Sequence, residues 1–338
     1  MIKEAIAKIV DKKDISIDEA KLVMDEIMDG KATSSQIAAF IIALRIKGET
    51  IDEVIGCVQS MRSKSVKINS IHKILVDTCG TGGDRANTFN ISTTAAFVAA
   101  GAGVPVAKHG NRAVSSHCGS ADLLKSLGVN IEMSPEKVEE CLNKIGIGFL
   151  FAPILHPAMK YAAEPRRDIG IRTIFNILGP LTNPANAQAQ VVGVYAYNLT
   201  EIVACVLGSL GSTHVFAVHG TDGLDEITIT GDTKISEWKD CKKHEFYVQP
   251  EDFGFKPAKL EEIKSDSMEE NTKIFLKVLN GEKGPCRDIV LMNAGAAIAA
   301  GGASKDIFEG AKLAEKSIDS GDALKKFNEF KDFTQNAK

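Results

Sequence analysis

Residues 74–94, with the sequence ILVDTCGTGGDRANTFNISTT, decide the fold class of this chain. Ile74-Leu75-Val76 is a short apolar run, typical of a buried parallel strand. A glycine-rich turn follows, and the Ala-rich segment from Ser92 to Gly101 has the composition of a helix. A strand that passes through a turn into a helix is the repeating unit of α/β proteins, so this stretch predicts a parallel sheet covered by helices.

The same alternation continues along the chain to residue 218. Short apolar runs predict strands at residues 104–107, 148–151, 191–197 and 215–218, with helices between them at residues 120–127, from residue 134, and at residues 198–210. Residues 227–230 alternate apolar and polar side chains as a strand does. We therefore expect an α/β domain with a mainly parallel sheet.

The N-terminal 65 residues carry a different signal, three capping boxes in succession. In each box a Ser or Thr is followed three residues later by Glu or Gln, a pattern that starts helices; the pairs are Ser16 and Glu19, Thr33 and Gln36, and Thr50 and Glu53. Gly30 and Gly48 stand where helices are expected to end. These features predict a small all-helical domain over residues 1–70, which should pack on the rest of the chain because it is small for an independent core.

Residues 156–184 interrupt the alternation, because four prolines are spread among their helical stretches. We expect this segment to return to the helical domain. The α/β domain then comprises residues 71–155 and 185–338.

Composition and charge exclude several classes of protein. Of the 338 residues, 44% are hydrophobic and 25% are charged, which excludes a disordered or collagen-like chain, and no apolar run is long enough to span a membrane. The net charge of −4 gives no overall attraction to nucleic acid. Seven cysteines without a CxxC pair disfavour a disulfide framework, and the N-terminus lacks the apolar segment of a signal peptide. We expect a protein of the reducing cytoplasm, without a nucleic-acid or membrane partner.

The glycine-rich turn has the features of a phosphate site. Gly80, Gly82 and Gly83 let backbone amides point at one spot and let a bulky anion approach closely. The Ser-Thr-Thr of residues 92–94 then places hydroxyls and free amides at a helix N-terminus. The turn is neither a Walker A loop, since no Lys follows the last glycine in the required place, nor a dinucleotide fingerprint. The alternative is a tight turn with an ordinary N-cap.

A basic loop with the sequence KHGNRAVSSHCGS follows the second predicted strand, at residues 108–120. Ligands of α/β sheets bind at the carboxyl ends of the strands, where Lys108 and Arg112 would supply positive charge for a phosphate. The loop would then form the second wall of the same anion site. The alternatives are a solvated surface loop with a structural His109, or a nucleophile pair of Cys118 with a histidine, although adjacent residues rarely point at each other.

An acidic turn ends the predicted strand at residues 215–218. Asp225 and Glu226 are adjacent carboxylates, and Asp222 places a third acid close to them. Such acids repel one another, and Mg2+ prefers a few carboxylates together with water and substrate phosphates. The sequence therefore predicts a cation site in a solvent-accessible turn, with simple solvated charges as the alternative.

Three arginines lie in the proline-interrupted segment: Arg166, Arg167 and Arg172. One of them could bind a carboxylate through two parallel hydrogen bonds. The spacing does not choose among them, and ordinary surface charge is the alternative.

Together these motifs resemble the anthranilate phosphoribosyltransferase family. The resemblance rests on GTGGD at residues 80–84 with NIST at 90–93, KHGNR at 108–112, RTIFNILGPLTNP at 172–184 and DGLDE at 222–226, and it covers nearly the whole chain. It implies a helical domain hinged to a larger α/β domain and a homodimer formed through the helical domain. It also implies Mg2+-dependent transfer of phosphoribosyl from phosphoribosyl pyrophosphate (PRPP) to the amine of anthranilate, in tryptophan biosynthesis.

The resemblance also implies roles for individual residues. Asn111 and Arg166 match the anthranilate contacts, and Ser92, Asp225 and Glu226 match the metal ligands, with two Mg2+ ions expected per monomer. No residue is expected to act as an acid, a base or a nucleophile, whereas Lys108, Asp225 and Glu226 act electrostatically. The substrate-binding positions are matched by Gly80, Gly83, Asp84, Thr88, Asn90, Ser92, Thr93, Lys108, His109, Gly110, Asn111, Arg112, Ala113, Val114, Ser115, Ser116, Ser120 and Arg166.

The chain departs from the family pattern at two places, and two other functions stay open. Arg85 stands where Gly is more frequent, and His117-Cys118 stands where Lys-Ser is more usual. One alternative is a pyrimidine nucleoside phosphorylase of the same architecture, against which the adjacent Asp225 and Glu226 argue. The other is a noncatalytic nucleic-acid-binding relative, against which the net acidic charge argues.

Overall fold

Each of the three predicted capping boxes starts a helix of an N-terminal bundle. The computed structural model, which describes residues 1–84, 86–112 and 118–337, begins with α1 (Ile2–Val10), α2 (Ile17–Met28), α3 (Ser34–Lys47) and α4 (Ile51–Lys64). In α2, α3 and α4 the cap hydroxyl accepts from the N3 amide, and the N3 side chain accepts from the cap amide. Gly48 ends α3 with a φ of 92°, which glycine adopts readily. The predicted all-helical N-terminal part is confirmed.

Seven strands form one sheet in the order β3-β2-β1-β4-β5-β6-β7. The strands are β1 (Val76–Gly80), β2 (Val106–Gly110), β3 (Ile147–Phe151), β4 (Ala189–Gly193), β5 (His214–Gly220), β6 (Thr233–Lys239) and β7 (Lys242–Val248). The strands from β3 to β5 in this order run parallel, and β6 and β7 add an antiparallel edge. The predicted α/β fold with a mainly parallel sheet is confirmed.

The strand boundaries differ from the prediction, and one predicted strand is wrong. β1 begins at Val76 and β2 at Val106, both later than predicted, and β4 ends at Gly193. Residues 227–230 form no strand. The amide of Ile227 instead donates to Asn293 Oδ1 at 2.9 Å, so a distant side chain supplies the hydrogen bond that a neighbouring strand would supply.

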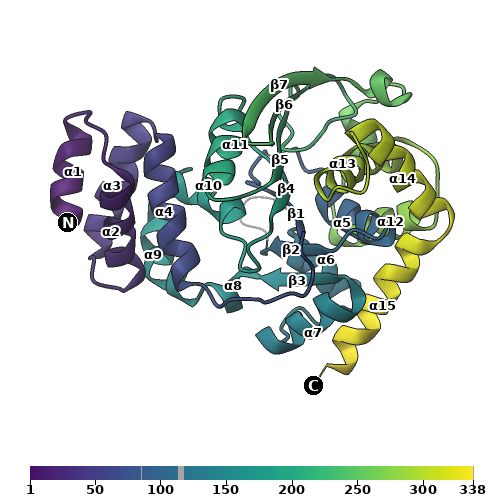
Figure 1. Ribbon diagram of the computed structural model, residues 1–338, viewed down its shortest axis with the longest axis horizontal. Coiled ribbons are helices and arrows are strands. Elements are labelled where there is room, and N and C mark those ends of the chain that lie inside the picture. Colours follow the sequence, from purple (N-terminus) through teal and green to yellow (C-terminus); the bar gives the residue numbers. More distant parts are fainter. Residues whose placement is uncertain (85, 113–117, 338) are drawn as a thin grey trace.

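Helices cover both faces of the sheet (Figure 1). On one face lie α10 (Ile174–Leu181) and α11 (Leu199–Ser209), which contact the bundle, and on the other lie α5 (Ile91–Gly101) and α13 (Pro285–Ala300). The other helices are α6 (Ser120–Ser126), α7 (Pro135–Ile145), α8 (Ala152–Leu155), α9 (Lys160–Ile169), α12 (Met268–Leu279), α14 (Ile307–Asp319) and α15 (Asp322–Asn336), with 3-10 turns at Pro157–Met159, Pro250–Phe253 and Leu260–Ile263. Within the described ranges, no helix combines the length and the apolar character needed to cross a membrane.

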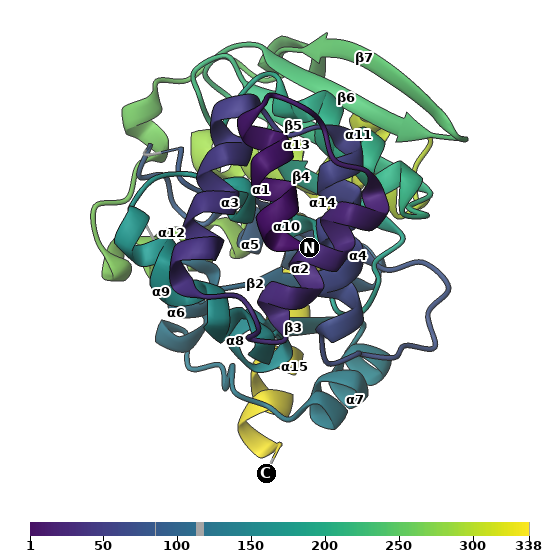
Figure 2. The ribbon, with the colours of Figure 1, turned by 90° about the vertical axis from the view of Figure 1, so that its left-hand side faces the viewer.

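Two hydrophobic cores lie on the two faces of the sheet. One extends from the bundle through α10 and α11 to Val192, Val215 and Ala217 of the sheet. The other lies between the opposite face and α5, α13 and α15. Figure 2 shows the bundle in front of the sheet. The bundle thus shares its core with the sheet, as its small size predicted. All seven cysteines are free.

Residues 156–184 pack largely on the bundle. Helix α9 contacts α2 and α3, and α10 contacts α4. Arg62 of α4 donates through Nε to the carbonyl of Leu181 at 2.9 Å. The division into a helical domain (residues 1–70 with 156–184) and an α/β domain stays our prediction, and this packing supports it.

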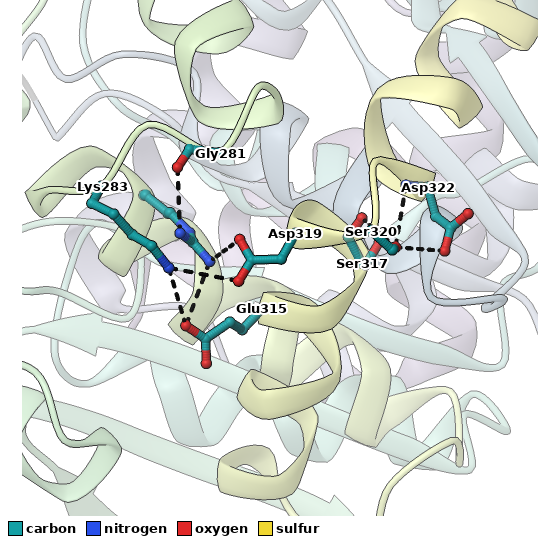
Figure 3. Close-up of polar contacts among 8 residues, drawn as sticks. Gly281, Lys283, Glu315, Ser317, Asp319, Ser320 and Asp322 are labelled. Carbon is teal, nitrogen blue, oxygen red and sulfur yellow. Dashed lines mark hydrogen bonds and ion pairs between the residues drawn. The ribbon is translucent and has the colours of Figure 1, made fainter.

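A buried arginine fastens α13 to α14. The Arg287 side chain is fully buried, and its Nη2 donates to Asp319 Oδ1 at 2.7 Å and to Glu315 Oε1 at 3.5 Å. Figure 3 shows these two carboxylates together with Lys283 and Gly281, which complete the cluster. The N-terminal end of α13 is therefore held in place by the neighbouring helix.

Candidate active site

The candidate active site lies at the carboxyl ends of β1 and β4, where the strand order reverses. The chain proceeds from β1 outward to β2 and β3 on one side, and it resumes with β4 on the other. In open α/β sheets ligands bind at such a switch point. Three predicted features meet here: the glycine-rich loop (residues 80–84) after β1, the basic loop (residues 108–120) after β2, and the acidic turn (residues 222–226) after β5.

Two glycines make room for Asp225 at this edge. Gly80 and Gly193 are register partners on β1 and β4. A Cβ on Gly80 would lie 2.5 Å from Asp225 Oδ2, and a Cβ on Gly193 would lie 1.5 Å from the Asp225 carbonyl oxygen. The acidic turn can therefore fold over the strand ends only because both residues lack a side chain. The sequence reasoning missed Gly193, although a glycine inside the apolar run VVGV was a usable signal.

Each acid of the pair is tied to one of the two predicted phosphate-binding elements. Asp225 Oδ2 accepts from the Gly82 amide at 2.7 Å. Glu226 Oε1 accepts from the Ser92 amide, at the N-terminus of α5, at 3.2 Å. Both acids are half-buried, so the prediction of a solvent-accessible turn is only partly right. The structure thus joins the acidic turn to the glycine-rich loop and to α5.

Burial and mutual repulsion raise the pKa of both acids. Burial, with the neighbouring charge of Asp84, raises the pKa of Asp225 to about 7. Burial, with the charge of Asp225, raises the pKa of Glu226 well above its ordinary value, and Lys108 opposes this effect only in part. Three carboxyl groups that repel one another in a half-buried site would be stabilised by a cation.

Asp222 is not the third repelling acid, contrary to the prediction. Its Oδ2 accepts from the hydroxyl of Thr228 at 2.6 Å and from the hydroxyl of Thr230. Its Oδ1 accepts from the Leu224 amide at 3.1 Å. Asp222 therefore holds the turn together, and Asp84 of the glycine-rich loop takes its place among the interacting acids.

The donor set of this edge fits Mg2+. Asp225 and Glu226 offer carboxylate oxygens, and Ser92 adds a hydroxyl at the same helix N-terminus. The described residues contain no group of three or more His, Cys, Asp or Glu side chains that alone could hold a metal. A site with two carboxylates leaves coordination positions for water and substrate phosphates, which is how Mg2+ is usually bound.

Lys108 supplies positive charge beside the acids. It is 3% exposed, its Nζ donates to the Thr78 carbonyl, and the same nitrogen lies 3.5 Å from Ser92 Oγ. Burial lowers the pKa of Lys108, and the charges of Asp77 and Glu226 oppose that shift. The ammonium group is thus held between β1 and the N-terminus of α5.

Asp77, which the sequence reasoning missed, organises the start of the basic loop. This fully buried residue of β1 accepts from the His109 amide at 3.0 Å and from Asn183 Nδ2 at 2.8 Å. Asn183 also donates to the Ala107 carbonyl at 2.8 Å. An acid inside the apolar strand sequence LVDTC was the available signal.

His109 and His156 form a buried pair with ring centroids 5.1 Å apart. Burial lowers the pKa of His156 to about 4 and the pKa of His109 well below its ordinary value. The Nε2 atoms of both are buried and have no hydrogen-bond partner among the described residues. Both rings are therefore neutral at neutral pH, so neither adds positive charge to the basic loop.

Asn111 and Arg112 of the basic loop are exposed, and Gly110 and Ser120 are half-buried. Ser120 Oγ donates to the Asn111 carbonyl at 3.3 Å, and a Cβ on Gly110 would lie 2.3 Å from the same hydroxyl. Arg112 Nη2 lies 3.4 Å from Glu132 Oε1, so this guanidinium does not pair with the acids of the turn. The predicted residues Arg85, Ala113, Val114, Ser115, Ser116 and His117 lie outside the described residues.

The segment between the glycine-rich loop and α5 is anchored by contacts to distant residues. Thr88 forms an isolated antiparallel bridge with Lys264. The Asn90 amide donates to Asn271 Oδ1 at 3.2 Å, and Asn90 Nδ2 donates to the Cys118 carbonyl at 3.0 Å. The Thr93 hydroxyl lies 3.4 Å from Asn90 Oδ1. These contacts fix the direction in which the N-terminus of α5 points.

The structure distinguishes the three arginines that the spacing could not. The half-buried Arg166 on α9 lies with its Cζ 5.0 Å from the centre of the Phe175 ring, and burial lowers its pKa. It forms no ion pair within the described part of the chain. Arg172 donates to the Gly83 carbonyl, so it contacts the glycine-rich loop directly. Arg167 is exposed.

The two parts of the fold match one class of protein. Residues 72–324 match the a/b domain of the glycosyl transferase family, and residues 3–65 match the helical bundle domain of that family. The chain is thus a glycosyl transferase built from these two parts.

Comparison with individual relatives shows which family of glycosyl transferases this chain belongs to. An anthranilate phosphoribosyltransferase of Acetivibrio thermocellus is 54% identical over 334 residues, which are 99% of this chain and 97% of the relative. The crystal structure of the anthranilate phosphoribosyltransferase of Thermus thermophilus matches with a TM-score of 0.93 at 40% identity, over 98% of this chain and 99% of that one. This chain belongs to the anthranilate phosphoribosyltransferase family, and it is an enzyme.

The Saccharomyces cerevisiae anthranilate phosphoribosyltransferase is a more distant structural relative. Its complex with PRPP and Mg matches with a TM-score of 0.89 at 28% identity, over 99% of this chain and 98% of that one. Its complex with 4-fluoroanthranilate matches with a TM-score of 0.89 at 27% identity, over 99% of this chain and 97% of that one.

Proposed function

We propose that this enzyme transfers the phosphoribosyl group of PRPP to the amine of anthranilate, with Mg2+, and gives N-(5-phosphoribosyl)anthranilate and pyrophosphate in tryptophan biosynthesis. The observation that carries the proposal is the half-buried, mutually repelling pair Asp225 and Glu226, hydrogen-bonded to the glycine-rich loop and to the N-terminus of α5. A divalent cation and a pyrophosphate group would complete this arrangement. The yeast relative, solved with PRPP and Mg and with 4-fluoroanthranilate, supports it.

Ser92, Asp225 and Glu226 would hold Mg2+, with two ions per monomer. When bound, the metal would neutralise the negative charge that develops on pyrophosphate as it leaves the ribose C1. The amides of the glycine-rich loop and of α5 would hold the phosphates, and Lys108 would add a fixed positive charge. The transition state should have oxocarbenium character, so catalysis is mainly positioning and charge stabilisation.

No acid or base residue is assigned. The amine of anthranilate is unprotonated at neutral pH, so it attacks without a strong base. Asn111 and Arg166 would contact anthranilate, with the guanidinium facing its carboxylate, because Arg166 is half-buried without an acidic partner among the described residues. The remaining substrate-binding residues, from Gly80 to Ser120, are proposed on the family resemblance.

A homodimer formed through the helical domain is part of the proposal. Val10, Leu22 and Ile46 are exposed by 66%, 47% and 78% on the bundle. Large exposed apolar patches mark contact surfaces, and a second copy would cover these three side chains if they form part of the dimer interface.

One assay tests the proposed activity. The purified protein is mixed with anthranilate, PRPP and Mg2+, and the loss of anthranilate fluorescence is followed. Loss should require both substrates and should stop when EDTA removes the metal. No loss of anthranilate, together with phosphate-dependent cleavage of thymidine or uridine, would replace the proposal by a nucleoside phosphorylase.

A further inference from the structure

We infer that Asn293 of α13 is a positioning residue that sets the place of the Asp225 and Glu226 pair. The inference rests on the proposed role of this pair in binding Mg2+. Asn293 is 2% exposed and lies outside every motif that carries the family resemblance.

The side-chain amide of Asn293 pairs with the backbone of Ile227, the residue directly after Glu226. Asn293 Oδ1 accepts from the Ile227 amide at 2.9 Å, and Asn293 Nδ2 donates to the Ile227 carbonyl at 2.9 Å. A third hydrogen bond, from Nδ2 to the Ile289 carbonyl at 2.9 Å, ties the same amide to its own helix. Both protons of the amide are thus used, so its orientation is fixed.

Among the described residues, only Asn293 forms hydrogen bonds with the backbone of Ile227. Ile227 lies in the segment that was predicted as a strand and that forms none, and its side chain is fully buried. Without Asn293 its amide and carbonyl would lack partners in the interior, where unmade hydrogen bonds are unfavourable. The turn would then move to find new partners. The backbone of Asp225 lies directly on Gly193, so the turn cannot move closer to the sheet. A movement of Ile227 would therefore carry the carboxylates away from their present places.

Helix α13 is a suitable support for this contact. It packs on α14 backbone to backbone, since a Cβ on Gly295 would lie 2.6 Å from the Ala311 amide nitrogen. Its N-terminal end is held by Arg287 and Asp319, part of the cluster that Figure 3 shows. It also packs on α5, which carries Ser92. One helix therefore supports both the acidic turn and the helix that presents the third proposed ligand.

The first test compares Asn293→Ala with a matched control, Thr334→Val. Thr334 is fully buried and its hydroxyl accepts from the Asn130 amide at 3.1 Å, in no contact with the proposed site. The Mg2+ concentration at half-maximal rate should rise roughly 10-fold or more in Asn293→Ala, as for residues that orient metal ligands. The KM for anthranilate should stay within about twofold, because the anthranilate contacts are unchanged. Thr334→Val should change neither quantity.

The second test does not depend on activity. Hydrogen exchange of the metal-free protein should speed up at residues 225–228 in Asn293→Ala and stay unchanged there in Thr334→Val. If Asn293→Ala does not fold, Asn293→Ser, which keeps one polar atom at this position, is measured in its place. Unchanged exchange together with an unchanged Mg2+ dependence would overturn the inference, and so would equal effects of the control variant. A wild-type protein without Mg2+-dependent turnover would refute the proposed function, whereas the exchange result would still decide whether Asn293 positions the turn.

Discussion

The two charged ends of the candidate active site differ in what holds them. The negative end, Asp225 and Glu226, is fixed by amides of the glycine-rich loop and of α5 at the carboxyl ends of the strands. The positive end, Arg166, lies on α9, which packs on the N-terminal bundle, and its guanidinium stacks on Phe175. Both ends are half-buried, and within the described part of the chain neither forms an ion pair.

This difference suggests different tasks for the two ends. The acids belong to the sheet edge, where we propose that they hold a cation beside a pyrophosphate group. Arg166 belongs to helix α9, which packs on the bundle, and we propose that it binds anthranilate alone. The reacting atoms must come within about 3–3.5 Å of each other, so both ends must meet on the same pair of substrates. Changes at the acids should therefore abolish the reaction, whereas changes at Arg166 should weaken the binding of one substrate.

The largest effect is expected at the negative end. The double variant Asp225→Asn with Glu226→Gln should lower turnover by at least about 10³-fold, because a lost metal ion removes several kcal/mol of charge stabilisation. The fluorescence assay measures the rate, and circular dichroism checks that the variant is folded. Wild-type rates at saturating Mg2+ would refute the metal assignment.

A smaller and more selective effect is expected at the positive end. Arg166→Ala should raise the KM for anthranilate by about one to two decades, since a lost hydrogen bond to a charged group is worth about 1.5–3 kcal/mol. The KM for PRPP should change much less. Arg167→Ala is the matched control, because Arg167 is the exposed neighbour on the same helix. Equal effects on both substrates would instead assign Arg166 to phosphate binding or to closure of the two domains.

The smallest effect concerns stability. Here removal of an acid is expected to be favourable, whereas in the first prediction it abolishes activity. The pKa of Asp225 is raised to about 7 in the folded protein, against about 3.9 in an unfolded chain. The metal-free protein should therefore lose stability as the pH rises from about 4 to about 7. Asp225→Asn removes the charge, so in EDTA it should increase the free energy of unfolding by about 1–3 kcal/mol at pH 8 and by less at pH 5. Urea unfolding at the two pH values measures this, and a difference independent of pH would contradict the assigned repulsion.

The sequence predicted the bundle well because its signals are local. Ser16, Thr33 and Thr50 each find their capping partner three residues away, so the helix starts could be identified without knowledge of the fold. The strand predicted at residues 227–230 was wrong because the hydrogen-bond partner of this segment is distant in sequence. Asn293 is 66 residues from Ile227, and no local pattern reveals such a contact.

The same distinction holds within the candidate site. The glycine-rich loop, the basic loop and the acidic turn were found because each is a motif at the end of a strand. Gly193 was missed because its role depends on the pairing of β1 with β4 and on the turn that folds over both. The choice of Arg166 as the anthranilate contact came from the family resemblance, because the spacing of the three arginines does not distinguish them.

Calorimetric titration of PRPP into the protein, without anthranilate, tests the central claim most directly, because it measures binding at the acidic turn apart from the chemistry. With excess Mg2+ the wild-type protein should bind PRPP far more tightly than in EDTA. The double variant Asp225→Asn with Glu226→Gln should bind PRPP equally weakly under both conditions. If the double variant keeps the wild-type dependence on Mg2+, the acid pair is not the metal site and the account of this edge is wrong.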